Sequence, residues 1–198
     1  SRFLEKPAFA VEQGRNAARH MERDSRKALD ISLGLLRNYE EEQAERVQPI
    51  LEKENTGLSV AFFAVSSDGT ITVRKPNDYV SSMIELAGGN YSLNGYLPEE
   101  DSALSTMKMQ MEDFYVAEKD ADILIYNGTI EGELTSVDEL IAKNSLFADF
   151  KAVKSGQVYT TGSNFYQQTS MTCDFIEDLN KVLIGSDDTD YHFLKHIQ

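Results

Sequence analysis

The side chains that could bind a ligand share one property: each lies just after a segment with the composition of a β-strand. These candidates are Arg74, Lys75, Tyr79, Asn127, Thr129, Asn164 and Tyr166. A cationic pair beside tyrosines and amides would suit an anionic, partly aromatic ligand, through charge-assisted hydrogen bonds and stacking. The alternative is that they are ordinary solvated loop residues, and Arg74 and Tyr166 are the strongest individual candidates.

Catalytic motifs are absent from the sequence. It has no G-x-S-x-G elbow, no phosphate-binding G-x-x-x-x-G-K-[ST] loop, no G-x-G-x-x-G and no H-E-x-x-H. The carboxylate pairs, Glu131 with Glu133 and Asp187 with Asp188, fall in predicted polar loops and favour hydration over acid–base chemistry. The sequence therefore predicts a protein that is not an enzyme and that needs no cofactor.

Metal binding is not predicted either. His192 and His196 have the i, i+4 spacing that can share a metal on a helix, but no third ligand of suitable type is evident. Cys173 is the single cysteine, which excludes an internal disulfide and a cysteine metal cage. Its apolar neighbours favour a packed thiol on a helix over a nucleophile.

The charge of the chain restricts its partners. There are 33 acidic and 19 basic residues, giving a formal net charge of −14. Such a surface repels phosphate backbones and anionic lipid, so we expect no nucleic-acid partner and no direct membrane adhesion. No run approaches the ~18 apolar residues that a membrane span needs, and no signal peptide is evident. We therefore expect Ser1 to be a processing boundary or the start of a fragment.

The elements that must position the candidate residues alternate between strand and helix from Leu58 onward. Strands are expected near 58–65, 70–74, 122–126 and 157–161. Helices are expected near 78–87, 109–119, 136–142, 145–152 and 165–184. This alternation predicts an α/β fold, a Rossmann-like open sheet with helices on both faces, in which ligands sit at the carboxyl ends of strands.

Local signals fix several of these boundaries. Asp68-Gly69 is a tight-turn dipeptide, Asn77 or Asp78 can cap the helix that follows, and Gly88 can end it in a left-handed conformation. Residues 1–55 contain no convincing strand, and their apolar residues keep helical spacing. We therefore divide the chain into a helical segment, 1–55, and an α/β domain, 56–198.

Three segments resemble a known family. "NDYVSSMIELAGGNYSL", "MQMEDFYVAEKDADILIYNG" and "FADFKAVKSGQVYTTGSNFY" are similar, in the same order, to elements of the class III periplasmic-type substrate-binding proteins of ABC importers. The resemblance covers roughly residues 28 to 185. This family includes receptors for iron-siderophore, haem and cobalamin ligands.

The resemblance implies one lobe of a two-lobe clamp, the carboxyl-terminal one, with an interlobe helix over about 28–52. It implies a ferric siderophore, haem or cobalamin-type ligand, and ABC permease subunits as partners. Glu112 matches the acidic residue that docks the permease, although a carboxylate there would also stabilise a helix start. The implied location is the periplasm or the extracellular face of the cell membrane, with any lipid anchor absent from this chain.

Two other function classes remain open at this point. One is a stand-alone α/β ligand- or protein-interaction domain without a transport role. The other is an enzyme, supported only by the general versatility of the fold class.

Overall fold

The computed structural model describes residues 15, 19, 41–96, 104–163, 165 and 172–198. The chain divides into two units, Ser1–Glu45 and Arg46–Gln198, and the second contains the α/β fold. Residues 41–51 are helical, while 28–40, the first part of the expected interlobe helix, lie outside the described residues. None of the described helices is long and apolar enough to cross a membrane.

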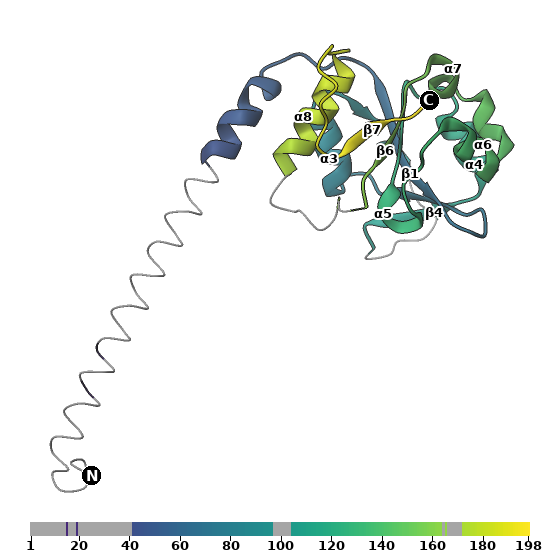
Figure 1. Ribbon diagram of the computed structural model, residues 1–198, viewed down its shortest axis with the longest axis horizontal. Helices are drawn as coiled ribbons and strands as arrows, with labels where there is room; N and C mark the ends of the chain where they lie inside the picture. Colours follow the sequence, from purple (N-terminus) through teal and green to yellow (C-terminus); the bar gives the residue numbers. More distant parts are fainter. Residues whose placement is uncertain (1–14, 16–18, 20–40, 97–103, 164, 166–171) are drawn as a thin grey trace, which may run out of the picture. The chain divides into compact units, whose positions relative to one another are not determined.

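One mixed sheet organises the second unit (Figure 1). Its strands are β1 (Ser59–Val65), β2 (Ile71–Arg74), β3 (Asn90–Tyr91), β4 (Thr106–Met109), β5 (Ile123–Tyr126), β6 (Val158–Thr161) and β7 (Leu194–His196). The order is β4-β2-β1-β5-β6-β7, and β3 pairs with the start of β1. β1, β5 and β6 are parallel, whereas β2 and β7 run antiparallel to their neighbours.

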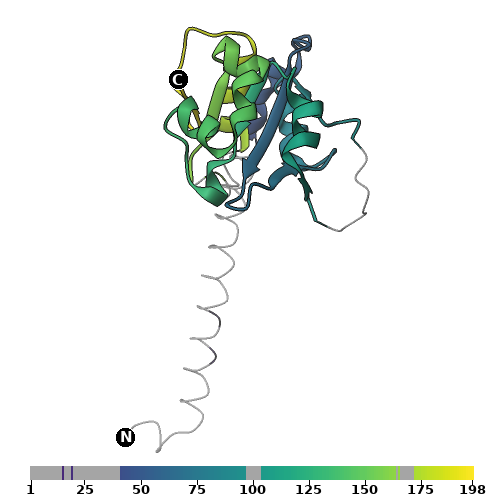
Figure 2. The ribbon, with the colours of Figure 1, turned by 90° about the vertical axis from the view of Figure 1, so that its right-hand side faces the viewer.

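Helices cover both faces of this sheet. They are α3 (Tyr79–Leu86), α4 (Met111–Glu118), α5 (Gly128–Glu131), α6 (Val137–Lys143), the 3₁₀ helix η1 (Ser145–Asp149), α7 (Lys151–Ser155) and α8 (Thr172–Leu183). In Figure 1, α3 and α8 lie to the left of the strands, and α4, α6 and α7 to the right. Figure 2, turned by 90°, has α4 and the green helices in front of the sheet. The expected α/β class with helices on both faces is confirmed.

The core follows from the alternation of side chains along β1. Phe63 contacts the rings of Phe114, Tyr126 and Phe147 on the α4 side. Its neighbour Phe62 points to the other face and contacts Phe165. Because both faces of β1 are covered, six of its seven residues are fully buried.

The predicted helix signals are largely confirmed. The Asp78 carboxylate caps α3 by accepting a hydrogen bond from the Val80 amide, and Gly88 has a φ of 93° after the helix. Ser136 caps α6 through the Glu139 amide, and the Glu139 carboxylate reaches back to Thr135.

Three strands were not predicted from the sequence. They are β3, which pairs with β1, β4, which precedes the confirmed helix expected at 109–119, and β7, which the uncertain tail forms against β6. The expected helix at 145–152 is broken at Phe150 into η1 and α7. The last expected helix, 165–184, is described only over Thr172–Leu183.

Candidate functional site

The three parallel strands end at one edge of the sheet, which we call the carboxyl edge: β1 at Val65, β5 at Tyr126 and β6 at Thr161. Arg74 was expected at the carboxyl end of a strand on the same edge as the other candidates. Its strand, β2, runs in the opposite direction, because it is antiparallel to β1. The β1–β2 hairpin nevertheless extends beyond the end of β5, since Phe63 pairs with both Val73 and Tyr126. By this register Arg74 lies level with Phe62 and Ile125, two residues short of Asn127 at the carboxyl edge.

Arg74 is buried and forms an ion pair with Asp78. Its Nε and Nη2 atoms donate to the two carboxylate oxygens at 2.7 and 3.1 Å. The guanidinium carbon also lies 4.8 Å from the centre of the Tyr79 ring, a cation–π contact. Because Tyr79 is 49% exposed, this arrangement holds an aromatic surface at the solvent boundary over a neutralised ion pair. Lys75, the next residue, is half-buried, and its amide donates to Ser105.

The Asn127 side chain caps the start of α5. Its side-chain oxygen accepts hydrogen bonds from the amide and hydroxyl of Thr129, which caps α5. The next amide, Gly128 N, donates to Thr161 Oγ1 at 3.0 Å. A Cβ atom on Gly128 would lie 2.2 Å from the Thr161 carbonyl oxygen, so only glycine fits this approach between the β5 and β6 ends.

The third candidate segment, which follows β6, is described only in part. Asn164 and Tyr166 lie outside the described residues. Phe165 between them is buried against Phe62 and Phe175. The amide of Ser163 donates to the Glu133 carboxylate at 2.9 Å.

Glu133 is therefore more than a hydrated loop residue. It also forms an ion pair with Lys195 of β7, and these two contacts lower its pKa. Glu131, two residues earlier, is the last residue of α5 and is exposed at the carboxyl edge.

Glu112 is exposed in the first turn of α4, next to Asp113. The preceding strand, β4, ends where Met109 pairs with Ile71, at the tip of the β1–β2 hairpin. Helix α4 therefore begins at the carboxyl edge, on the sheet face opposite the α3 and α8 helices.

The other end of α4 holds a buried carboxylate that the sequence analysis missed. Glu118 is fully buried, and its Oε1 accepts a hydrogen bond from Ser92 Oγ at 2.8 Å. Its Oε2 has no hydrogen-bond partner among the described residues. Burial raises the pKa of Glu118 to about 7, and burial together with the Glu118 charge raises the pKa of Tyr91.

The histidines and the cysteine take structural roles. His196 lies in strand β7 and bonds the Gly156 carbonyl, and His192 Nδ1 lies 3.7 Å from Asp178. The two histidines do not share a helix, so their i, i+4 spacing does not place both side chains on one metal ion. Cys173 is half-buried on α8, where burial raises the pKa of its thiol. Within the described part of the chain, no cluster of His, Cys, Asp and Glu could hold a metal ion.

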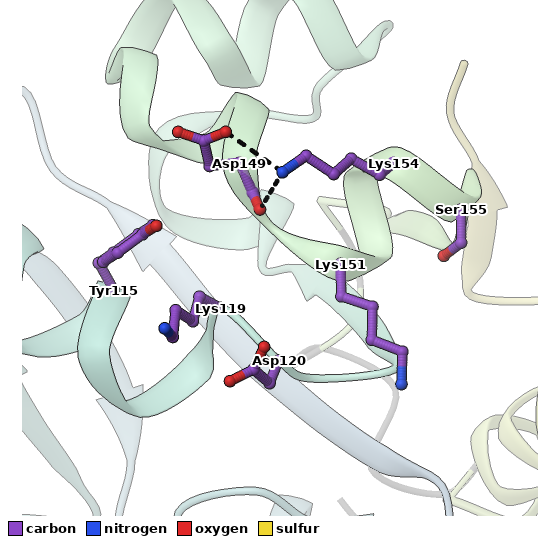
Figure 3. A pocket seen from close by; sticks show the side chains of 7 residues that line it. All are labelled: Tyr115, Lys119, Asp120, Asp149, Lys151, Lys154 and Ser155. Carbon is purple, nitrogen blue, oxygen red and sulfur yellow. Dashed lines mark hydrogen bonds and ion pairs between the residues drawn. The ribbon is translucent and has the colours of Figure 1, made fainter.

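A hollow of about 480 Å³ lies at the opposite edge, where β5 and β6 begin. It is lined by Tyr115, Lys119, Asp120, Asp149, Lys151, Lys154 and Ser155 (Figure 3). Two of its lysines are already paired: Lys154 with Asp149, as the dashed lines show, and Lys151 with Asp122. None of the predicted ligand-binding residues lines this hollow.

No protein-family model matches the chain, and no curated protein matches it. Solved structures do match, all with low sequence identity. The TroA-like periplasmic binding protein FepB from Veillonella parvula shares 14% identity over 81% of this chain and 54% of its own, with a TM-score of 0.59. The siderophore periplasmic binding protein from the fuscachelin gene cluster of Thermobifida fusca shares 18% identity over 75% and 53%, with a TM-score of 0.55.

A third match is the periplasmic heme binding protein HutB of Vibrio cholerae, with 11% identity over 71% of this chain and 51% of its own and a TM-score of 0.54. The chain thus spans about half the length of the solved structures that it matches. All three are named as binding proteins. The chain has the fold of one lobe of the class III, TroA-like periplasmic binding proteins.

Proposed function

We propose that the chain is a ligand-binding lobe of the extracytoplasmic solute-binding component of an ABC importer. Its ligand would be a ferric siderophore or a related iron or tetrapyrrole complex. The observation that carries this proposal is the shared one-lobe fold with proteins named for siderophore and heme binding. The fold places loops and helix starts from several segments at the carboxyl edge, where α/β sheets bind ligands. The role is binding, not catalysis.

The carboxyl edge would form this lobe's half of the ligand site. Tyr79 would stack on the ligand, because its ring is half-exposed and is held by Arg74 from below. Lys75 and Thr129 would add polar contacts from the two sides of β1. Asn127 would shape the edge through its cap. Asn164 and Tyr166 belong to the proposal from the sequence alone.

Binding would be a clamp closing on the ligand, with a second lobe supplying the other contacts. The interlobe helix expected from the sequence over about 28–52 would restrict the motion to a small hinge change. We place the protein in the periplasm or at the extracellular face of the cell membrane, where a lipid anchor outside this chain would hold it.

The permease would dock on the start of α4. Glu112 is exposed there, at the same edge as the proposed ligand site, so a closed clamp would present both to the membrane partner. Complementary charge governs encounter and register in such contacts.

The test is a titration of the chain with a ferric catecholate, a ferric hydroxamate, haem and cobalamin, followed by tyrosine fluorescence. We expect micromolar or weaker binding of one class, because half of the contacts are missing. Tyr79→Ala should weaken it at least about tenfold, the order expected for a lost aromatic contact of 1–2 kcal/mol. Tyr115→Ala, at the opposite edge, is the matched control.

Nanomolar binding by this chain would contradict the half-site account. Absence of binding by all four ligands would favour the alternative, an interaction domain without a transport role. Equal loss of binding in Tyr79→Ala and Tyr115→Ala would place the site away from the carboxyl edge.

A further inference from the structure

The ion pair beneath Tyr79 determines which ligand charge this edge accepts. A cation near a ligand site usually indicates an anionic ligand, as the sequence analysis assumed for Arg74. In the structure both donor atoms facing Asp78 are occupied by its carboxylate, and the side chains of the pair are 9% and 5% exposed. A bidentate pair that is this buried presents no net charge to a ligand.

The rest of the carboxyl edge is acidic. Among the described residues at the ends of β2, β4 and β5, three cations stand against four carboxylates, with the Glu133–Lys195 pair left out because its charges cancel. The cations are Arg74, Lys75 and Lys143, whose Nζ lies 5.6 Å from the centre of the Tyr126 ring, and the carboxylates are Asp78, Glu112, Asp113 and Glu131. At the hairpin tip, Asp68 and Lys108 add one charge of each sign. This surface repels an anion and accepts an uncharged or cationic complex.

Resting on the proposed function, we infer that this lobe is specific for an uncharged ferric tris-hydroxamate complex over a trianionic ferric tris-catecholate, and that Asp78 sets this specificity. Three hydroxamate monoanions neutralise the ferric ion, whereas three catecholate dianions leave a trianion. The uncharged complex would rest on the exposed Tyr79 ring without meeting the repulsion of the edge. Asp78 acts through Arg74, as a positioning residue that cancels the nearest positive charge.

Asp78 is suited to a clean test, because its carboxylate has two roles that can be separated. It caps α3 through the Val80 amide and it neutralises Arg74. Asparagine and serine cap helices about as well as aspartate does. Asp78→Asn and Asp78→Ser therefore keep the helix start and expose the guanidinium charge.

The experiment is an amide chemical-shift titration of the ¹⁵N-labelled chain with two diamagnetic probes, the gallium complexes of a cyclic tris-hydroxamate and of a tris-catecholate. The wild-type chain should bind the uncharged probe about tenfold more tightly. Both Asp78 variants should tighten binding of the trianionic probe by roughly tenfold, from Coulomb attraction across a partly solvated gap, and leave the uncharged probe within about threefold. Asp113→Asn, a carboxylate at the same edge that is not paired with Arg74, should change either probe by less than about threefold.

Tighter wild-type binding of the trianionic probe would overturn the inference and leave the proposed function intact. An equal response of Asp78→Asn and Asp113→Asn would also overturn it, because Asp78 would then act only through net charge. Absence of binding by both probes, with the fold of each variant confirmed by its spectrum, would overturn the inference; the proposed function would then depend on the haem and cobalamin titrations.

Discussion

Replacing Glu118 by glutamine should flatten the dependence of stability on pH. Glu118 is fully buried at the end of α4, with one oxygen bonded to Ser92 and the other lacking a partner among the described residues. Burial raises its pKa from the ordinary 4.5 to about 7. In the unfolded chain the group returns to its ordinary pKa.

The sign follows from proton binding. Between pH 4.5 and pH 7 the folded protein holds a proton on Glu118 that the unfolded chain releases, so the free energy of unfolding falls as pH rises. The contribution is fully present below the unfolded pKa and is lost as pH rises through the folded pKa. The two values differ by about 2.5, and each pKa unit corresponds to ~1.4 kcal/mol, so the full loss is about 3 kcal/mol. Between pH 5 and pH 8 we expect about 2–3 kcal/mol of it.

Urea unfolding at several pH values measures this directly. Other groups also titrate in this range, so the informative quantity is the difference in slope between wild type and Glu118→Gln. The amide loses the titration but can still accept the Ser92 hydrogen bond. Glu112→Gln, the same change at an exposed site on the same helix, should keep the wild-type slope. Equal slopes for wild type and Glu118→Gln would refute the argument that burial keeps this carboxyl protonated.

Three further predictions concern the frame and the partner. Asp178→Ala should lower the free energy of unfolding, measured in urea, by about 2–4 kcal/mol. The buried Asp178 carboxylate accepts hydrogen bonds from three backbone amides at the start of the last strand, and the substitution would leave them without a partner. Asp187→Ala, at an exposed site, should cost less than ~0.5 kcal/mol. Gly128→Ala should cost at least about 2 kcal/mol because its Cβ would lie 2.2 Å from a carbonyl oxygen, whereas Gly95→Ala, with open space around it, should be nearly neutral. On the proposed transport role, Glu112→Arg in a complete two-lobe receptor should abolish uptake while ligand affinity stays intact. Normal uptake at matched expression would remove Glu112 from the proposed docking surface.

Much of the fold is encoded in local signals. The apolar run of β1, the Asp78 cap and the Gly88 stop each fix a boundary within a few residues, and the structure confirms them. The Asp68-Gly69 turn also indicates the direction of β2. A tight turn between two strands joins them antiparallel, so it already indicates that β2 cannot be a parallel strand.

The missed strands depend on distant partners. β7 forms because the Asp178 carboxylate on α8 accepts hydrogen bonds from the amides of His192, Phe193 and Leu194. β4 is four residues long and gains its partners from β2. Nothing in either short segment distinguishes a strand from a loop without those neighbours.

The candidate site shows the same limit. The sequence identified Arg74 and Tyr79 as candidate ligand-binding residues. The carboxylate that neutralises Arg74 is that of Asp78, which the sequence had predicted only as a possible helix cap. The spacing of four residues between opposite charges was visible, yet it has no fixed meaning outside a helix. Burial of Glu118 could not be predicted either, since it depends on how the end of α4 meets Ser92, a residue distant in sequence.

The most direct test of the account is the position of ligand contacts on the chain. A titration of the ¹⁵N-labelled protein with a gallium siderophore complex should shift amides at the carboxyl edge, around Tyr79 and Thr129. It should leave those of the opposite hollow, around Lys119 and Lys154, unchanged. Shifts centred on the hollow, with the carboxyl edge silent, would contradict the assignment of this edge as the ligand-binding half of a clamp.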